Sequence, residues 1–115
     1  MDSILTSIKK LLGIQEDYTQ FDPEIIVHIN SVFVILNQLG VGPDEPFFIT
    51  DKTATWNQFL TEGKEIKSVE SYMYLRVRLL FDPPANSFLV TSMEKQIEEF
   101  EFRQLVQAEE IKGAQ

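Results

Sequence analysis

The sequence predicts an all-α fold, a small helical bundle of about five helices with a long C-terminal helix and one extended loop. Two observations carry this prediction. Apolar residues recur every three or four positions in several separate segments, which is the spacing that places them on one face of an α-helix. The five glycines and five prolines stand mostly between these segments, where they end or forbid a helix. Because the chain has 115 residues, 43% of them hydrophobic, we expect one domain, 1–115, with its own core.

The first two helices are expected at 1–13 and 22–40. The second has the clearest start, because Asp22 can cap it, Pro23 suits its first helical position and Gly40 can close it. The first helix is expected to pack through Ile4, Leu5, Ile8, Leu11 and Leu12. The second is expected to pack through Ile25, Ile29, Val32, Phe33, Leu36 and Leu39.

The extended loop follows the second helix and carries two adjacent aromatic residues, Phe47 and Phe48. Two prolines and a glycine exclude regular structure at its beginning. Neighbouring side chains of an extended chain point in opposite directions, so at most one of the two rings fits easily into the domain's own core. The other is a candidate contact with a partner or a neighbouring subunit, and the alternative is a buried anchor of the loop.

Two further helices are expected at 53–62 and 65–81. The first is short and is marked by Trp56, Phe59 and Leu60, which stand three and four positions apart. The second ends at the Asp-Pro-Pro sequence that follows it, because a residue before proline avoids the helical region. Its inward face is expected to contain Ile66, Val69, Met73, Val77 and Leu80.

The last helix is expected at 86–110 and changes its apolar face along its length. It starts near Asn86 or Ser87, or several residues later if Thr91 opens a capping box. Its first part is expected to pack through Leu89, Met93, Ile97 and Phe100. After this stripe, apolar residues fall on the opposite side of the helix, and these candidate partner or subunit contacts are Phe102, Leu105 and Val106.

The composition excludes several classes of protein. The chain contains no cysteine, which excludes disulfides, thiolate metal sites and cysteine nucleophiles. Its net charge of −8 argues against tight wrapping of nucleic-acid phosphates, which requires cationic contacts. No segment of about 20 mostly apolar residues is present, and the N-terminal segment lacks the continuous apolar stretch of a signal peptide. The sequence therefore predicts a protein that is made and kept in the cytoplasm, without membrane association.

The residues that could support catalysis or metal binding are few. His28 is the only histidine and stands one turn after Glu24, but one such pair supplies too few metal ligands. A histidine beside the core stripe, bonded to Glu24 or to the backbone, is the favoured interpretation. Glu94, Glu98 and Glu101 share a face of the last helix, where a solvated or electrostatic surface is favoured over acid–base or metal chemistry. The sequence predicts no catalytic residue, no metal and no cofactor, and hence no enzyme.

Four segments, taken in order, resemble one family of small phage and prophage proteins. They are Gln38–Pro43, Trp56–Leu60, Tyr74–Pro84 and Met93–Arg103. The family is the head–tail connector, also called the head-completion or adaptor protein, of long-tailed double-stranded DNA phages. The resemblance covers nearly the whole chain, and its motifs are structural rather than catalytic.

The resemblance implies a structural protein of the virion neck that is assembled in the host cytoplasm. It implies a dodecameric ring under the portal protein, which extends the DNA channel and provides the docking surface for a neck or tail-completion protein. In relatives the terminal segments and loops make the subunit and portal contacts. Carried over by region, this implies contacts at Phe47 and Phe48, at Phe102, Leu105 and Val106, and in the tail that follows.

The acidic balance is compatible with a channel through which double-stranded DNA passes without sequence-specific binding. A cationic wall would hold the duplex through counterion release, whereas an acidic wall repels phosphate. The candidate channel-facing residues are Asp44, Glu45, Glu94, Glu98 and Glu101. Two alternatives stay open at this point. One is a small acidic interaction or regulatory protein, encoded by a prophage, that binds a host or phage partner, and the other is a metal-dependent enzyme of the bundle.

Overall fold

The computed structural model describes residues 3–60 and 65–114, with side chains as far as Gln107. Among the described residues the secondary structure is helical, apart from one isolated antiparallel bridge between Ser3 and Thr55, and the all-α prediction is confirmed. The helices are α1 (Ile4–Leu11), α2 (Asp22–Gln38), α3 (Trp56–Phe59), α4 (Ile66–Phe81) and α5 (Ser87–Ala114).

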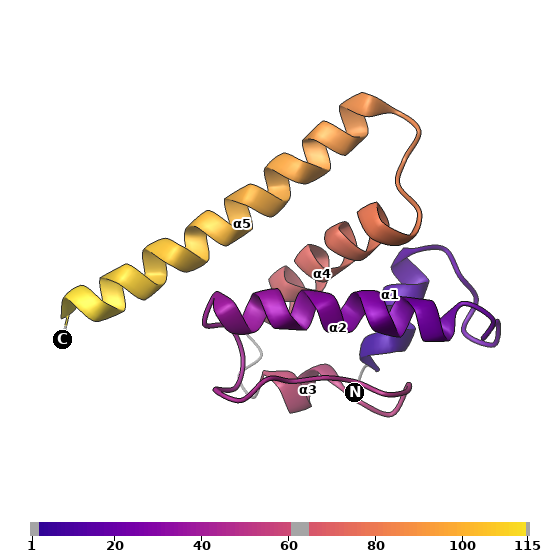
Figure 1. Cartoon of the computed structure of the whole chain (residues 1–115), viewed down its shortest axis with the longest axis horizontal. Helices are drawn as coiled ribbons and strands as arrows, with labels where there is room; N and C mark the ends of the chain where they lie inside the picture. Colours follow the sequence, from indigo (N-terminus) through magenta and orange to yellow (C-terminus); the bar gives the residue numbers. More distant parts are fainter. Residues whose placement is uncertain (1–2, 61–64, 115) are drawn as a thin grey trace.

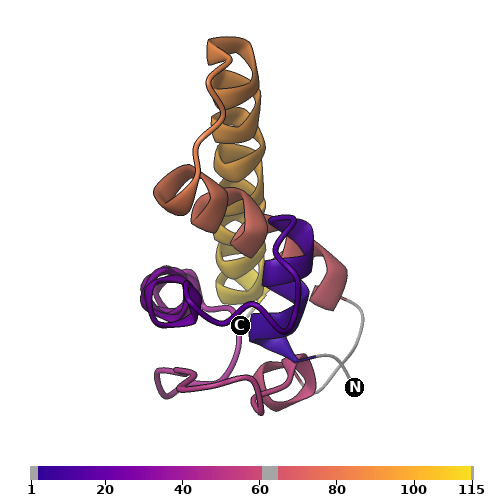
Figure 2. The same ribbon diagram turned by 90° about the vertical axis from the view of Figure 1, so that its right-hand side faces the viewer.

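The body of the molecule is built around α2 and α4. Figure 1 shows α2 across the middle, with α4 on one side and α3 with the preceding loop on the other. Figure 2, which looks along α2, shows α1 beside α4 and the loop beneath α2. α1 contacts both α2 and α4, whereas α5 contacts α4. The C-terminal part of α5 extends beyond the body, as Figure 1 shows.

The core lies between α1, α2 and α4, and an aromatic cluster joins the long loop to it. The Phe33 ring of α2 lies 4.7 Å from the ring of Phe59 and 5.1 Å from the ring of Phe47, measured between centroids. The Asn30 side chain fastens the same loop to α2, because its Nδ2 donates to the Ile49 carbonyl and its Oδ1 accepts from the Ile49 amide. Side chains far apart in the sequence therefore hold the loop against α2.

The helices begin and end close to the glycine and proline signals, with four differences. The last helix, expected to end at 110, continues past Gly113 to Ala114. The helix expected at 53–62 spans only Trp56–Phe59, because Leu60 already has extended backbone; 61 and 62 lie outside the described residues. α1 begins at Ile4, where the Ser3 hydroxyl accepts from the Thr6 amide; the expected residues 1–2 are likewise not described. The prediction that Asp22 caps α2 is wrong, since the cap position belongs to Phe21 and makes no side-chain hydrogen bond.

Three leucines expected in the core are exposed. Leu11, at the end of α1, is 46% exposed. Leu80 on α4 is 55% exposed and Leu89 on α5 is 54% exposed. Both lie next to the extended connection that joins the two helices and leaves the first turn of α5 apart from α4 (Figure 1). Met93, Ile97 and Phe100 are buried as predicted. Helical periodicity identifies the inward face correctly but does not show where the neighbouring helix ends.

Candidate interaction surfaces

The C-terminal half of α5 carries exposed apolar side chains beyond the part that packs on the body. Phe102 is 67% exposed and Leu105 is 53% exposed, whereas Val106 is half-buried. The predicted change of face is therefore present, because Phe100 is buried two residues before Phe102 is exposed. The role of these residues as contacts stays a prediction.

The two adjacent phenylalanines of the long loop have opposite environments. Phe47 packs against Phe33 and Phe59, so it anchors the loop in the core. Phe48 is 54% exposed. Of the two residues predicted as partner contacts, Phe48 thus offers a free surface, and Phe47 acts within its own chain.

One exposed aromatic residue was not expected from the sequence. Phe88, in the first turn of α5, is 85% exposed. The turn is set by Asn86, whose Oδ1 accepts from the amides of Phe88 and Leu89, so the predicted start near Asn86 is correct. Because this aromatic residue stands alone next to a helix cap, no apolar periodicity in the sequence indicates whether it is buried. Its exposure follows from the position of α4, which does not cover it.

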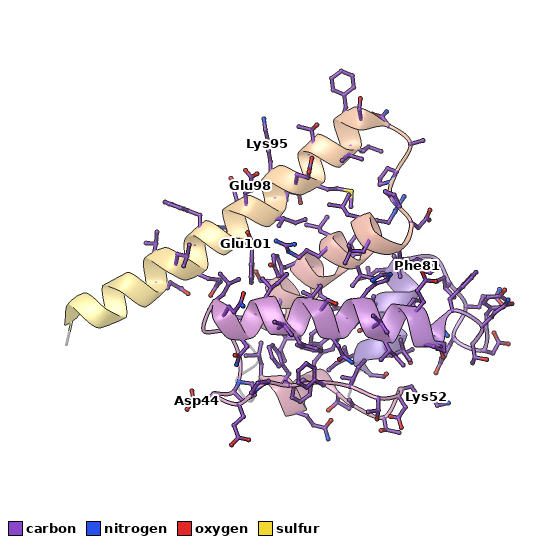
Figure 3. The ribbon with its side chains drawn as sticks, in the orientation of Figure 1. Asp44, Lys52, Phe81, Lys95, Glu98 and Glu101 are labelled. Atoms are coloured by element: carbon purple, nitrogen blue, oxygen red, sulfur yellow. The ribbon has the colours of Figure 1, made fainter. Side chains whose placement is uncertain are left out.

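The acidic candidates lie on two separate parts of the molecule. Asp44 and Glu45 are exposed on the long loop, and Glu94 and Glu98 are exposed on α5. Figure 3 shows Asp44 on the opposite side of α2 from Glu98. The structure therefore does not bring the two acidic sets together within one chain. The expectation that Glu101 shares the exposed face of Glu94 and Glu98 is wrong, because its carboxylate is held between α5 and α4.

A hydrogen-bonded network at the α4–α5 contact accounts for the position of Glu101. The Tyr72 hydroxyl donates to Glu101 Oε2 at 2.7 Å, and Arg76 Nε donates to the Tyr72 oxygen at 2.8 Å. The Arg76 guanidinium also forms an ion pair with Glu101. The Tyr72 ring is stacked on Phe100 with a centroid separation of 4.3 Å. This network fixes α5 on α4 through both polar and aromatic contacts.

The network shifts the titration of its members. Burial by itself would raise the pKa of the Glu101 carboxyl, but hydrogen bonds from Tyr72 and Arg76, together with the Arg76 charge, lower that pKa below its ordinary value. Burial, and then the hydrogen bond to Glu101, raise the pKa of the Tyr72 hydroxyl. Glu101 is therefore ionised and Tyr72 neutral at neutral pH, which is the pairing that the hydrogen bonds require.

The described residues contain no group of three or more histidine or acidic side chains positioned to hold a metal ion. His28 Nε2 lies 3.7 Å from Glu24 Oε1, one turn away, which is too far for the expected hydrogen bond, and this nitrogen has no hydrogen-bond partner among the described residues. None of the helices in the described part of the chain is long and apolar enough to cross a bilayer.

Comparison with known proteins identifies the family. Residues 4–111 match the family model described as phage connector protein. The chain belongs to the phage connector family. No curated protein and no solved structure matches it. The phage connector family is structural rather than enzymatic, and membership implies a virion component that interacts with portal or tail proteins in general.

In this connector, Glu101→Gln is expected to lower the free energy of unfolding by about 1 kcal/mol at pH 7, since one charged hydrogen-bond acceptor is lost. Because the folded-state pKa of Glu101 is lowered, the stabilisation is complete above the ordinary glutamate value of 4.5 and is lost as the pH falls through the folded-state pKa. Urea unfolding at several pH values measures the difference from the native protein. The exposed Glu98→Gln is the matched control and is expected to change little; a pH-independent effect of Glu101→Gln would contradict the prediction.

Proposed function

We propose that this connector forms a ring under the portal at the virion neck, extends the DNA channel, and provides the surface on which a neck or tail-completion protein docks. Membership in the phage connector family supports this function over the alternative of a prophage-encoded regulatory protein. The observation that carries the proposal is the division of α5 into a packed half and an exposed half.

The packed half of α5 holds the helix in a defined direction. Met93, Ile97 and Phe100 are buried against the body, and the network around Glu101 adds polar contacts at the same crossing. The exposed half then presents Phe102 and Leu105 at a set position relative to the body. An apolar surface held in this way suits a protein interface, because little conformational entropy is lost when it is buried. We expect this half to contact a neighbouring subunit or the portal.

The proposed channel wall uses exposed carboxylates. Glu94 and Glu98 on α5, or Asp44 and Glu45 on the long loop, would repel passing phosphate and leave the duplex free to slide. Glu101 contributes less, because Arg76 neutralises it. Electron cryo-microscopy of the assembled ring tests this part of the proposal. If all four exposed carboxylates faced the outer surface, the acidic wall would be excluded.

The contact surface is tested with the double substitution Phe102→Ser and Leu105→Ser in the full chain. Binding to DNA-filled heads that carry the portal is expected to weaken by about tenfold or more, which corresponds to about 1.4 kcal/mol. Co-sedimentation with the heads measures the loss. The melting temperature is expected to stay within a few degrees of the native value, because both side chains are exposed.

The matched control for this experiment is Val27→Ser together with Val34→Ser. These two valines lie on α2 and are 62% and 43% exposed, so the same kind of apolar surface is removed from a different face. Their substitution is expected to leave head binding unchanged. Equal loss of binding in both double variants, or no loss with the α5 variant, would refute the proposed contact surface.

A further inference from the structure

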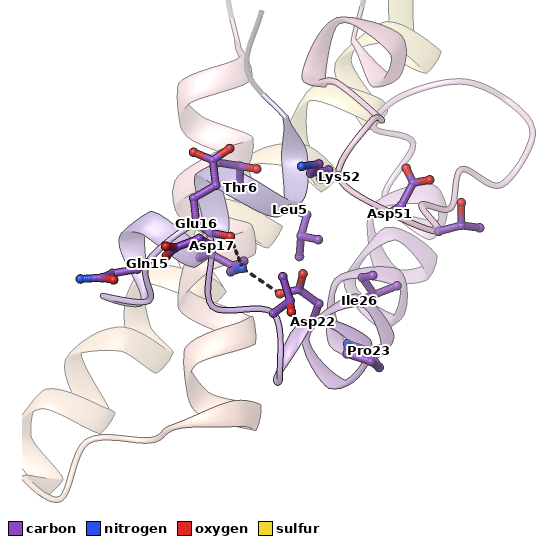
Figure 4. Close-up of a pocket in the computed structure, with 13 residues that line it drawn as sticks. Leu5, Thr6, Gln15, Glu16, Asp17, Asp22, Pro23, Ile26, Asp51 and Lys52 are labelled. Atoms are coloured by element: carbon purple, nitrogen blue, oxygen red, sulfur yellow. Dashed lines mark hydrogen bonds and ion pairs between the residues drawn. The ribbon is translucent and has the colours of Figure 1, made fainter.

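A cleft of about 1140 Å³ opens at the start of α2, between the α1–α2 connection and the segment around Asp51. Its floor is apolar and includes Leu5, Pro23 and Ile26 (Figure 4). In Figure 1 the α1–α2 connection lies at the opposite end of the molecule from the C-terminal end of α5. The cleft is therefore a surface separate from the α5 contact surface.

The α1–α2 wall of the cleft is held in place by a buried lysine. Lys9, which is 1% exposed, donates from Nζ to the carbonyl oxygens of Glu16 and Tyr18 at 3.0 and 2.7 Å. The same ammonium group lies 2.8 Å from Asp22 Oδ1. Two carbonyl acceptors and one carboxylate around this nitrogen tie the connection to both α1 and α2. This wall is thus formed before any partner binds.

The opposite wall is also fixed by local hydrogen bonds. The Asp51 carboxylate accepts from the Thr53 amide at 2.8 Å and from the Thr53 hydroxyl. These hydrogen bonds lower the pKa of Asp51, so its negative charge is retained at neutral pH. Two residues earlier the chain is anchored to α2 through Asn30 and Ile49. The backbone of both walls is therefore held at a defined position.

The charges around the cleft determine what it can accept. Its lining includes four carboxylates and only two ammonium groups. Lys9 and Asp22 form an ion pair with each other, so their charges cancel. With that pair set aside, three carboxylates and one ammonium group remain, so the lining as a whole is net negative and complements an apolar side chain flanked by cations. Figure 4 shows Glu16 and Asp17 on one side of Leu5 and Asp51 on the other, with Lys52 above Leu5. The α5 helix of a second copy is a poor match, because Glu94, Glu98 and Glu99 lie along it.

We infer that this cleft binds a partner protein through a short segment that carries an apolar side chain flanked by lysine or arginine. The apolar side chain covers Leu5 and Ile26, and the flanking cations pair with Asp17 on one wall and Asp51 on the other. The inference depends on the cleft alone. If the proposed function also holds, the partner is another protein of the neck, bound at the end of this chain opposite to the α5 contact surface.

The test uses two synthetic hexapeptides with the same Leu-Phe centre, one flanked by pairs of lysines and the other by pairs of glutamates. Each is titrated into the full-length, ¹⁵N-labelled protein. The lysine peptide is expected to shift the amide resonances of Leu5, Ile26 and Thr50, and to bind about tenfold more tightly than the glutamate peptide. No binding of the lysine peptide, equal binding of both peptides, or shifts centred on α5 would overturn the inference.

Two matched double variants distinguish binding in the cleft from the non-specific electrostatic attraction between an acidic protein and a basic peptide. Asp17→Asn with Asp51→Asn is expected to weaken the lysine peptide by about threefold or more. Glu94→Gln with Glu98→Gln removes the same charge from α5 and is expected to leave the affinity unchanged. An equal loss in both variants would refute the site. Because the peptides require no phage head, this result is independent of the head-binding test of the proposed function.

Discussion

Replacing Lys9 by methionine is expected to lower the free energy of unfolding by about 3 kcal/mol. Methionine can fill much of the space of the lysine stem, but it supplies no donor to the carbonyls of Glu16 and Tyr18 and no positive charge beside the Asp22 carboxylate. Removing one partner of a buried ion pair costs about 3–5 kcal/mol, because a charge is left without compensation. The lower end applies here, since the Asp22 side chain is 21% exposed and water can reach it. Urea unfolding followed by circular dichroism measures the change.

The neighbouring lysine provides the control. Lys10 is exposed on the same helix, so Lys10→Met is expected to change the unfolding free energy by less than about 0.5 kcal/mol. In a double-mutant cycle, Asp22→Asn added to Lys9→Met is expected to cost less than the sum of the two single substitutions, because the second removes the charge that the first left unpaired. Strict additivity, or equal effects at Lys9 and Lys10, would show that the ion pair does not hold the connection.

The helical architecture could be predicted because its signals are local. Pro23 in the first turn and Gly40 after the last turn bracket α2, and the apolar stripe between them faces the core. Burial of α5 also followed its stripe at Met93, Ile97 and Phe100. These features depend on one helix at a time, so periodicity along the sequence is sufficient to find them.

The interaction surfaces could be predicted only in part, because they depend on how separate segments meet. Lys9 and Lys10 look alike in the sequence, yet Lys9 alone is buried, since the α1–α2 connection folds back over it. Glu101 looks like Glu98, yet Tyr72 and Arg76 approach it from α4. The cleft combines α1, the α1–α2 connection, α2 and the long loop, and no single segment contains a sign of it. Periodicity places a residue on a face, but the neighbouring segment determines what that face meets.

Gly42→Ala is expected to lower the free energy of unfolding by about 2–5 kcal/mol. Gly42 has φ +93°, where an L-residue costs about 1–2 kcal/mol. A Cβ atom there would also overlap the ring of Phe59. The ring cannot move aside easily, because it packs between Phe33 and Phe47 in the aromatic cluster, and overpacking of this kind costs about 1–3 kcal/mol more.

Gly40→Ala separates the two contributions to this cost. Gly40 has φ +80°, close to that of Gly42, but a Cβ atom there would have no heavy atom within 4 Å. Its substitution is expected to cost only the backbone term of about 1–2 kcal/mol. Thermal unfolding of the two variants side by side gives the difference, which measures the contact between the loop and Phe59. Equal melting temperatures would mean that Phe59 yields to the added methyl group, and that the loop bearing Phe48 is held less firmly than its aromatic contacts imply.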